Sequence, residues 1–290
     1  MPDTPPPGIR IAYDTTGDLS DPVIVVIPAL GRQLIDWDGE LCDRLAAGGT
    51  CVVRMDNRDV GLSDRVEAGK VNLARLAAAR RAGEPLAVPY TLEDMAGDVV
   101  RVLDDLAVRR AHIAGISMGG RIAQLVAIGY PDRAASLISI ASTSGAHGID
   151  AATEHATRAL FAAPPRNRTG AIEAQLEARR ALAAPGTFDA AWERPRVAAE
   201  FDRAFDPAGV GRQLAAVMAD TDRTGALGAL ATPTLVIHGA EDPLVAPSAG
   251  RATAAAIPGA RYLEIGGLGH DLPPRVWPLV VPAILQHIHA

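Results

Sequence analysis

The amino-acid sequence predicts an α/β protein with a mostly parallel sheet, helices on both faces and an inserted block of helices. Continuous apolar runs such as VIVVI at 23–27 fit strands that are buried on both faces, as in parallel sheets covered by helices. These runs alternate along the chain with segments of helical periodicity, which favours a doubly covered sheet. Residues 145–230 contain no convincing strand pattern, and this indicates that helices are inserted between two strands.

The first half of the chain supplies most of the predicted sheet. We expect strands at 9–13, 23–27, 50–55, 111–116 and 137–140. We expect helices at 36–47, 91–106 and 119–128. The segment Thr91-Leu92-Glu93-Asp94 has the pattern of a capping box, which would start the second of these helices. Residues 65–90 contain several charges, Gly83 and two prolines, so we expect them to be irregular.

The second half begins with the helical block and then returns to the sheet. Prolines at 164–165, 185 and 207 break the helical stretches. Arginines recur between Arg158 and Arg212 with acids interleaved, and we interpret them as a solvated helix surface. Strand patterns resume at 233–238 and 260–265, and helical patterns at 247–256 and 275–289, the last disturbed at Pro278 and Pro282.

This order of elements predicts a division of the chain. We expect a core made of residues 1–144 and 231–290 and a helical cap made of residues 145–230. Ligands of open α/β sheets bind outside the carboxyl ends of the strands. The inserted helices are therefore placed to lie over a site at that edge.

Composition excludes several classes of protein. The chain has 290 residues with 48% hydrophobic content, enough for one large core. Its net charge of −6 argues against nucleic-acid binding. No apolar run is long enough to span a bilayer, and MPDTPPPGIR lacks the apolar segment of a secretion signal. We expect a soluble, cytoplasmic protein without a nucleic-acid or membrane partner; its oligomeric state stays open. We interpret Cys42 and Cys51 as buried reduced thiols.

The segment GISMGG at 115–120 suggests a nucleophile. A serine hydroxyl reacts only when a base, a group that orients the base and donors for the oxyanion are at hand. In a G-x-S-x-G elbow a strand turns sharply into a helix, the serine lies at the apex and small neighbours let the backbone pack closely. An expected strand precedes Ser117 and an expected helix follows it. Ser117 is our candidate nucleophile; the alternative is a serine in an ordinary tight turn.

The partners of an elbow serine follow in the order acid, then histidine. Asp242 lies on the loop after strand 233–238, and His270 lies on the loop after strand 260–265. Because Ser117 also follows a strand, all of these residues converge on the carboxyl edge of one sheet. Glu241 is the nearest alternative acid.

Other histidines are weaker candidates for the base. His238 and His112 lie at strand ends and are more simply structural, while His147 and His155, in or near the cap, could contact substrate or be surface residues. The chain has no H-E-x-x-H pattern, no phosphate-binding loop and no dinucleotide fingerprint. We therefore expect no metal and no cofactor.

The motifs together resemble those of a known family. GISMGG resembles the nucleophile elbow of cap-bearing serine hydrolases with the α/β-hydrolase fold, GAEDPLVAP their acid loop and GLGHDLP their histidine loop. The likeness spans the chain apart from the N-terminal lead and the cap. It implies that Ser117 is the nucleophile, His270 the base and Asp242 the acid that orients it. A serine nucleophile argues against the haloalkane dehalogenases and epoxide hydrolases of this fold, which use aspartate.

The resemblance also implies an oxyanion hole. One donor is the backbone N–H of Met118, which follows the nucleophile. The other is Leu30 in IPALGRQLIDW, although Pro28-Ala29 replace the family's usual His-Gly, and Gly31 could supply the backbone freedom instead. MDNRDVGLSDR resembles the family's acid-x-Arg-x-x-Gly-x-Ser turn, which implies that Asp56 or Arg58 braces the oxyanion loop.

The function predicted from the sequence is hydrolysis of small-molecule carboxylic esters through an acyl-enzyme, without a cofactor. The chain is similar to bacterial esterases that include methylesterases of aromatic polyketide pathways. The same triad could instead serve a lactonase, C–C hydrolase, thioesterase, aminopeptidase, perhydrolase or lyase. A non-catalytic ligand-binding protein with the same fold is the alternative from another class.

Overall fold

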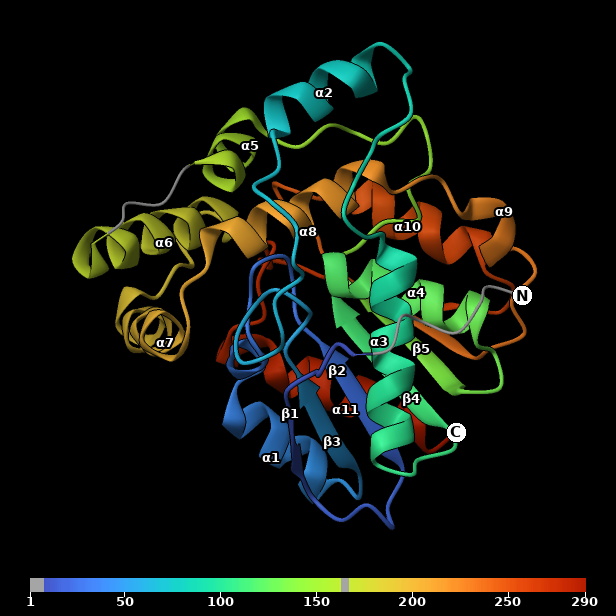
Figure 1. Ribbon diagram of the computed structural model, residues 1–290. Helices are drawn as coiled ribbons and strands as arrows, with labels where there is room; N and C mark the ends of the chain where they lie inside the picture. The colour runs from blue at the N-terminus through green and yellow to red at the C-terminus, as the bar shows by residue number, and fades with distance from the viewer. Residues whose placement is uncertain (1–7, 163–166) are drawn as a thin grey trace.

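A single mixed sheet forms the centre of the computed structural model, which describes residues 8–162 and 167–290. Within these residues the strand order is β1-β3-β2-β4-β5-β6-β7 (Figure 1). β1 is antiparallel to β3, and every other neighbouring pair is parallel. The strands are β1 (Tyr13–Thr16), β2 (Val23–Ile27), β3 (Cys51–Met55), β4 (Ala111–Ile116), β5 (Ala134–Ile140), β6 (Thr234–Gly239) and β7 (Arg261–Ile265).

Helices connect the strands and cover both faces of the sheet. The α-helices of the described residues are α1 (Gly39–Ala47), α2 (Leu73–Arg81), α3 (Leu92–Asp105), α4 (Met118–Gly129), α5 (Glu154–Phe161), α6 (Arg168–Leu182), α7 (Ala190–Arg203), α8 (Pro207–Ala219), α9 (Thr224–Leu227), α10 (Pro247–Ala256) and α11 (Trp277–Ile288). Short 3₁₀ helices, η1 (Leu34–Asp36) and η2 (Pro274–Val276), precede α1 and α11. None of these helices is long and apolar enough to cross a membrane.

Two hydrophobic cores lie on opposite faces of the sheet. One packs α3 and α4 against the strands, and the other packs α1 and α11 against the opposite face. The neighbouring residues Ile24 and Val25 of β2 belong to different cores, and both are fully buried. Burial on both faces is the reason for the continuous apolar runs, and the predicted fold class is confirmed.

The first predicted strand is misplaced. β1 begins at Tyr13 and not at Ile9, and it ends at Thr16. Residues before it bond to a loop and not to a strand: the amide of Arg10 donates to Asp64 and the amide of Ala12 to Ser63. The alternating pattern that predicted a strand at 9–13 thus belongs mostly to extended chain that lies outside the sheet.

Two further predictions about helices are wrong. α2 lies in the stretch expected to be irregular; Asn72 caps it, yet only Leu76 is buried, so its apolar periodicity is weak. α11 runs unbroken through Pro282. Pro278 lies in the first turn, where a missing N–H costs nothing, and buried side chains such as Ile284 hold the helix despite the hydrogen bond lost at Pro282.

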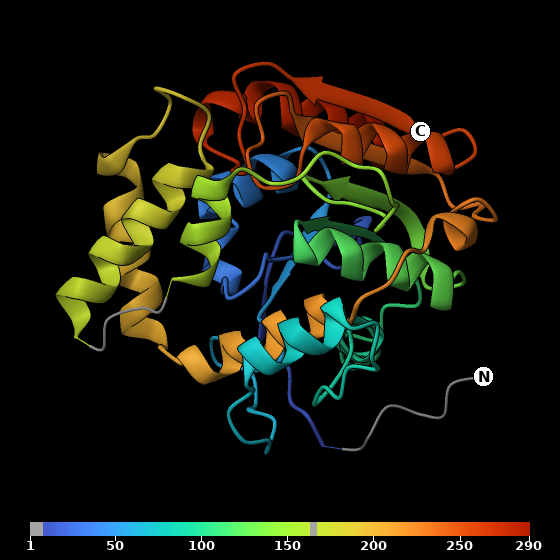
Figure 2. The same ribbon diagram turned by 90° about the horizontal axis from the view of Figure 1, so that it is seen from above.

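Helices α5 to α9 lie between β5 and β6. The described residues of 145–230 contain no strand. α6 packs against both α5 and α7, which lie together at one end of the molecule, and α8 packs against α2 (Figures 1 and 2). α9 lies apart from them and packs against α10 and α4. Pro207 is the first residue of α8 and Pro185 lies between α6 and α7. The predicted break at 164–165 and the lead at 1–7 lie outside the described residues.

Candidate active site

Ser117 lies at a strained corner between β4 and α4. Its φ of +57° and ψ of −117° are values that residues with a side chain rarely adopt. The amide of Ser117 donates to the carbonyl of Ile140 over 2.9 Å, and the hydroxyl of Ser142 donates to the carbonyl of Ser117 over 2.8 Å. These bonds from the end of β5 and from the segment that follows it hold the corner in its strained shape.

The glycines around Ser117 are required by close backbone contacts. A Cβ on Gly115 would lie 2.1 Å from the carbonyl oxygen of Gly119, and a Cβ on Gly119 would lie 2.2 Å from that of Ile27. A Cβ on Gly120 would lie 2.5 Å from the Cβ of Ser142. Only glycine lets α4 start this close to β2 and β4, so the sequence GISMGG is the local cause of the elbow.

A chain of hydrogen bonds joins the predicted site residues. His270 Nε2 lies 2.8 Å from Ser117 Oγ, and His270 Nδ1 lies 2.7 Å from Asp242 Oδ2. The side chains come from the loops after β4, β6 and β7. The amide of His270 donates to Leu182 at the end of α6, which fixes the backbone of the histidine loop from the other side.

The carboxylate of Asp242 is held in its charged form. Its Oδ1 accepts hydrogen bonds from the amides of Leu244 and Val245 at 2.9 and 2.8 Å. Burial raises the pKa of Asp242, but the nearby His270 and the hydrogen bonds from His238, His270 and Val245 outweigh it. The pKa of Asp242 therefore lies well below its usual range. An ionised Asp242 can only accept, so the proton of this pair is on His270 Nδ1 and Nε2 is free to accept from the serine.

The alternative site residues face elsewhere. Glu241 is exposed and accepts from the amide of Gly267. His238 is fully buried and bonds through Nε2 to the carbonyl of Val245, so it lies beside Asp242 at 3.5 Å without a contact to Ser117. His112 pairs with Ser136 on the next strand.

The two histidines of the helical block are surface residues. His147 and His155 are exposed, and neither lines the cavity at Ser117. Among the described residues, no group of three or more His, Cys, Asp or Glu side chains could hold a metal ion.

The predicted oxyanion donors are the amides of Leu30 and Met118. Met118 is the first residue of α4, so its N–H has no acceptor within the helix. Neither amide donates to another group in the described part of the chain. Gly31 has a φ of +70°, which supplies the predicted backbone freedom directly after Leu30.

Asp56 braces the loop that carries Leu30. Its Oδ1 accepts from the amide of Leu34 at 2.7 Å, and its Oδ2 accepts from the amide of Leu62 at 2.8 Å. The Arg58 side chain instead forms a buried pair with Asp98 on α3. Of the two residues expected to brace the loop, Asp56 is thus the one whose side chain bonds to it.

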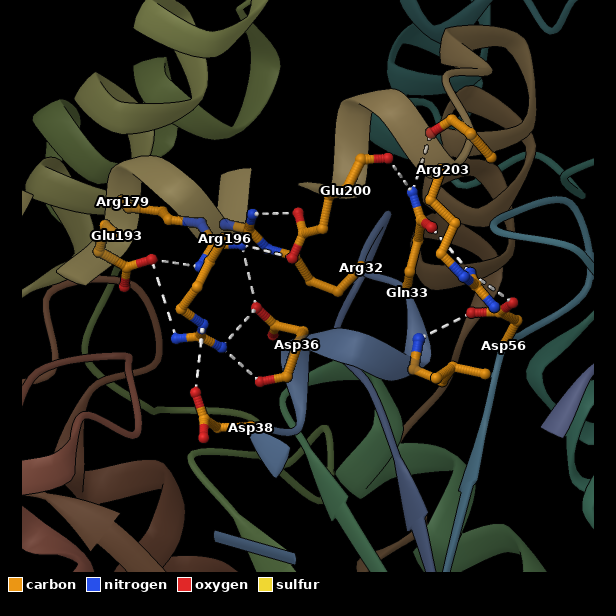
Figure 3. Close-up of polar contacts among 12 residues, drawn as sticks. Arg32, Gln33, Asp36, Asp38, Asp56, Arg179, Glu193, Arg196, Glu200 and Arg203 are labelled. Carbon is orange, nitrogen blue, oxygen red and sulfur yellow. Dashed lines mark hydrogen bonds and ion pairs between the residues drawn. The ribbon is translucent and has the colours of Figure 1, made fainter. Parts of the chain in front are cut away.

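A cavity of about 270 Å³ opens at Ser117 and His270. Leu30, Gly31 and other residues of the core line it together with residues of the inserted helices. One wall is apolar and includes Leu160, Ala171, Ile172, Val197, Phe201, Val210 and Leu272. Another part of the lining is charged and includes Arg32, Asp36, Arg179, Glu193, Arg196 and Glu200, the set that we call the charged wall (Figure 3).

Arg179 is the centre of the charged wall. Its guanidinium donates to Glu193, Glu200 and Asp36 at 2.5, 2.7 and 3.0 Å, although the side chain is only 7% exposed. Burial disfavours the charge of Asp36, but Arg179 and its neighbours outweigh it and lower the pKa of Asp36 to about 2.

The charged wall corrects in part the interpretation of the arginines between Arg158 and Arg212 as a solvated surface: Arg158, Arg168, Arg180 and Arg194 are exposed as expected, whereas others are not. Arg179, Glu193, Glu200 and Arg212 are all buried. Glu193, Arg196 and Glu200 are spaced so that they lie on one face of α7. This spacing is the one feature of the sequence that could have indicated a charged cluster. The sequence did not indicate that Asp36 on η1 and Arg179 on α6 would be their partners.

Known proteins resemble this chain over nearly its whole length. Residues 22–273 match the family model of the alpha/beta hydrolase fold. The rhodomycin D methylesterase DnrP of Streptomyces peucetius is 29% identical, with 94% of this chain and 93% of that protein covered. A putative carbamate hydrolase, RutD of Variovorax paradoxus (strain S110), is 31% identical over 80% of this chain and 79% of its own length. The crystal structure of a hydrolase from Pseudomonas aeruginosa PA01 superposes with a TM-score of 0.72 at 26% identity, covering 98% of this chain and 96% of that one.

Proposed function

The chain belongs to the α/β-hydrolase fold family, and from this premise we propose that it hydrolyses carboxylic esters with Ser117 as the nucleophile, His270 as the base and Asp242 as the orienting acid. The observation that carries the proposal is the continuous pair of hydrogen bonds from Ser117 through His270 to Asp242 at the strained elbow. This is the arrangement that activates a serine hydroxyl.

The proposed reaction uses each group in turn. Ser117 Oγ attacks the ester carbonyl while His270 Nε2 takes its proton, and Asp242 stabilises the imidazolium that results. The amides of Leu30 and Met118 donate to the oxyanion of the tetrahedral intermediate. His270 then gives its proton to the leaving alcohol, and an acyl-enzyme remains. Water, activated by His270, releases the acid and restores Ser117.

We also propose that residues 145–230 act as a cap over a core of residues 1–144 and 231–290. Residues of α6, α7 and α8 line the cavity that opens at Ser117. Their side chains thus decide which acyl and alcohol groups fit. A cavity with one apolar and one charged wall suits a small-molecule ester that carries polar groups on one side of an apolar body.

A methyl ester of an aromatic polyketide is the second candidate substrate. The similarity to a rhodomycin D methylesterase favours it, since the two chains align over more than nine-tenths of each. The charged wall supports the same candidate, because buried Nε atoms of Arg179 and Arg196 lack a hydrogen-bond partner and could donate to substrate oxygens.

The first test is hydrolysis of p-nitrophenyl esters from acetate to laurate by wild type and Ser117→Ala. Activity that is lost in Ser117→Ala supports the serine mechanism, and the chain-length profile sizes the acyl pocket. Labelling by a fluorophosphonate probe is the companion measurement. A wild-type protein that neither hydrolyses esters, methyl esters included, nor labels at Ser117 would instead be a non-catalytic ligand-binding protein.

A further inference from the structure

The loop after β2, residues 28–36, is bonded mainly to the inserted helices. Its core-side contacts include the bonds from Asn57 to the carbonyl of Pro28 and from the amide of Leu34 to Asp56. Bonds and ion pairs to α6, α7 and α8 begin directly after Leu30, at Gly31, Arg32, Gln33 and Asp36. The conformation of the oxyanion loop therefore depends on residues far along the chain.

Gln213 on α8 makes the contact nearest to Leu30. Its Oε1 accepts from the amide of Gly31 at 2.9 Å, and its Nε2 donates to the carbonyl of Arg58 at 2.8 Å. The side chain is fully buried. Both ends of the amide are thus satisfied, and Gln213 links the oxyanion loop to the turn that follows β3.

α8, which carries Gln213, is fixed against the turn that follows β3. Arg212, the neighbour of Gln213, forms a bidentate pair with Asp59 at 2.7 and 2.8 Å. A Cβ on Gly209 would lie 2.1 Å from the carbonyl oxygen of Asp59, so the helix lies directly on this turn. Val210 packs against Gly31 from the same helix.

A second set of bonds holds the loop from α7. Gln33 donates through Nε2 to the carbonyls of Glu200 and Ala204 at 2.7 and 2.8 Å. Arg203 donates to Gln33 Oε1 and pairs with Asp56, both at 2.8 Å (Figure 3). Gln33 and Gln213 thus hold the loop on the side after Leu30.

The position of Gly31 decides where Leu30 points. The N–H that Gln213 holds belongs to the peptide that directly follows Leu30, and Gly31 has a φ of +70°, where glycine is free to turn. The Leu30 N–H lies on the preceding peptide, so without an acceptor for the Gly31 N–H the chain after Leu30 would be free to shift and would carry the Leu30 amide away from the oxyanion. An oxyanion donor is effective only within a narrow range of positions.

We propose that Gln213 is a positioning residue of the oxyanion hole, acting through the Gly31 amide on Leu30. The proposal rests on the proposed function, in which the Leu30 N–H stabilises the oxyanion. It assigns to α8 a part in catalysis besides shaping the cavity.

The test compares Gln213→Met, which removes the acceptor, with Gln213→Glu, which in its protonated form keeps an acceptor oxygen for Gly31 and a donor for the carbonyl of Arg58. Gln124→Met is the matched control, because Gln124 is also fully buried and bonded at both ends of its amide, to Ser139 and Arg223, away from the loop. kcat and KM for p-nitrophenyl esters, the rate of fluorophosphonate labelling at Ser117 and the melting temperature are measured for each. If Gln213→Met fails to fold, the shorter Gln213→Asn replaces it.

We expect Gln213→Met to lower kcat by about 10- to 100-fold with KM changed less than about twofold, because loss of a whole oxyanion donor costs about 10²–10³. The labelling rate should fall in parallel, because attack on phosphorus uses the same oxyanion donors. Gln213→Glu should recover most of kcat, and Gln124→Met should keep kcat within about twofold of wild type whatever its melting temperature.

An unchanged kcat and labelling rate in Gln213→Met would overturn the proposal, as would an equal loss in Gln124→Met. The outcome is separable from the proposed function. Loss of activity in Ser117→Ala with full activity in Gln213→Met would leave the hydrolase intact and remove only the role of Gln213. If the wild type hydrolyses none of the esters, the labelling rate alone decides.

Discussion

Asp242 and His270, separated by 28 positions in the chain, lie with Oδ2 and Nδ1 2.7 Å apart in a buried pair. The other carboxylate oxygen of Asp242 is held by the amides of Leu244 and Val245. Because the pKa of Asp242 is lowered in the folded protein, its charge stabilises the fold above the pKa of an unfolded aspartate, about 3.9. This stabilisation is lost as the pH falls from that value toward the lower pKa of the folded protein. Because the pKa is lowered, Asp242 is charged at the neutral and mildly alkaline pH of an esterase assay.

Asp242→Asn should lower kcat by about 10⁴-fold, because an amide at this position favours the wrong tautomer of His270. Steady-state kinetics on p-nitrophenyl acetate at pH 8 measure the loss. Glu241→Gln is the control, because the Glu241 side chain is exposed and bonds to Gly267. A large loss in Glu241→Gln together with an active Asp242→Asn would move the acid to Glu241.

Gly119→Ala should damage both the elbow and the oxyanion loop. The added Cβ would lie 2.2 Å from the carbonyl oxygen of Ile27 and 2.8 Å from that of Pro28, which are backbone atoms that cannot move freely. We expect a loss of about 1–3 kcal/mol in the free energy of unfolding and a fall in kcat.

Gly129→Ala at the other end of α4 is the matched control for Gly119→Ala. Its Cβ would meet nothing within 4 Å, so the variant should be as stable as wild type or more so. Urea denaturation and kinetics on the two variants measure the difference. Equal stability and activity of Gly119→Ala and Gly129→Ala would show that the close packing at the elbow is not required.

Much of the site could be predicted because it depends on strand ends. A buried parallel strand shows as a continuous apolar run, and the residue after it must lie at the carboxyl edge of the sheet. Ser117 and Asp242 follow such runs, His270 follows the half-exposed edge strand β7, and the structure brings the three residues together. Their position follows from the sheet and needs no knowledge of the inserted helices.

The charged wall and the bonds of Gln213 could not be predicted in the same way. Arg179 meets Asp36 over 143 positions, and Gln213 meets Gly31 over 182. Such pairs depend on how α6, α7 and α8 dock, and helix periodicity says only which residues share a face. Charged residues are usually exposed, so the buried network looked like an ordinary helix surface.

Arg58→Met should destabilise the protein strongly. The Arg58 and Asp98 side chains are 3% and 1% exposed, and the guanidinium donates to both carboxylate oxygens at 2.7 and 2.8 Å. Removing Arg58 leaves a buried carboxylate without its cation, which costs about 3–5 kcal/mol. Denaturation by urea at pH 7 measures the loss.

The double variant Arg58→Met/Asp98→Leu separates the lost pair from lost packing. It should be more stable than Arg58→Met, because neither charge is then buried alone. If the double variant were the less stable of the two, Arg58 would act mainly through its other contacts, such as its position over the ring of Tyr90.

Asp271→Asn should stabilise the protein at neutral pH. Asp271 lines the cavity beside His270, and its Oδ1 is buried without a hydrogen-bond partner. Burial raises the pKa of Asp271 to about 6, although Arg275 opposes the shift. The folded protein therefore binds this proton more tightly than the unfolded chain does, and the contribution of Asp271 to the stability of the wild type falls as the pH rises from about 4 to above 6. Asparagine has no charge to bury, so the variant should exceed wild type by about 1–3 kcal/mol at pH 7.

The same difference should vanish at pH 4, where Asp271 is protonated in the folded wild type. Urea denaturation of wild type, Asp271→Asn and Asp132→Asn at both pH values tests this, since Asp132 is an exposed aspartate whose replacement should change little. A stabilisation by Asp271→Asn that is as large at pH 4 as at pH 7 would mean that shape, and not the buried charge, is responsible.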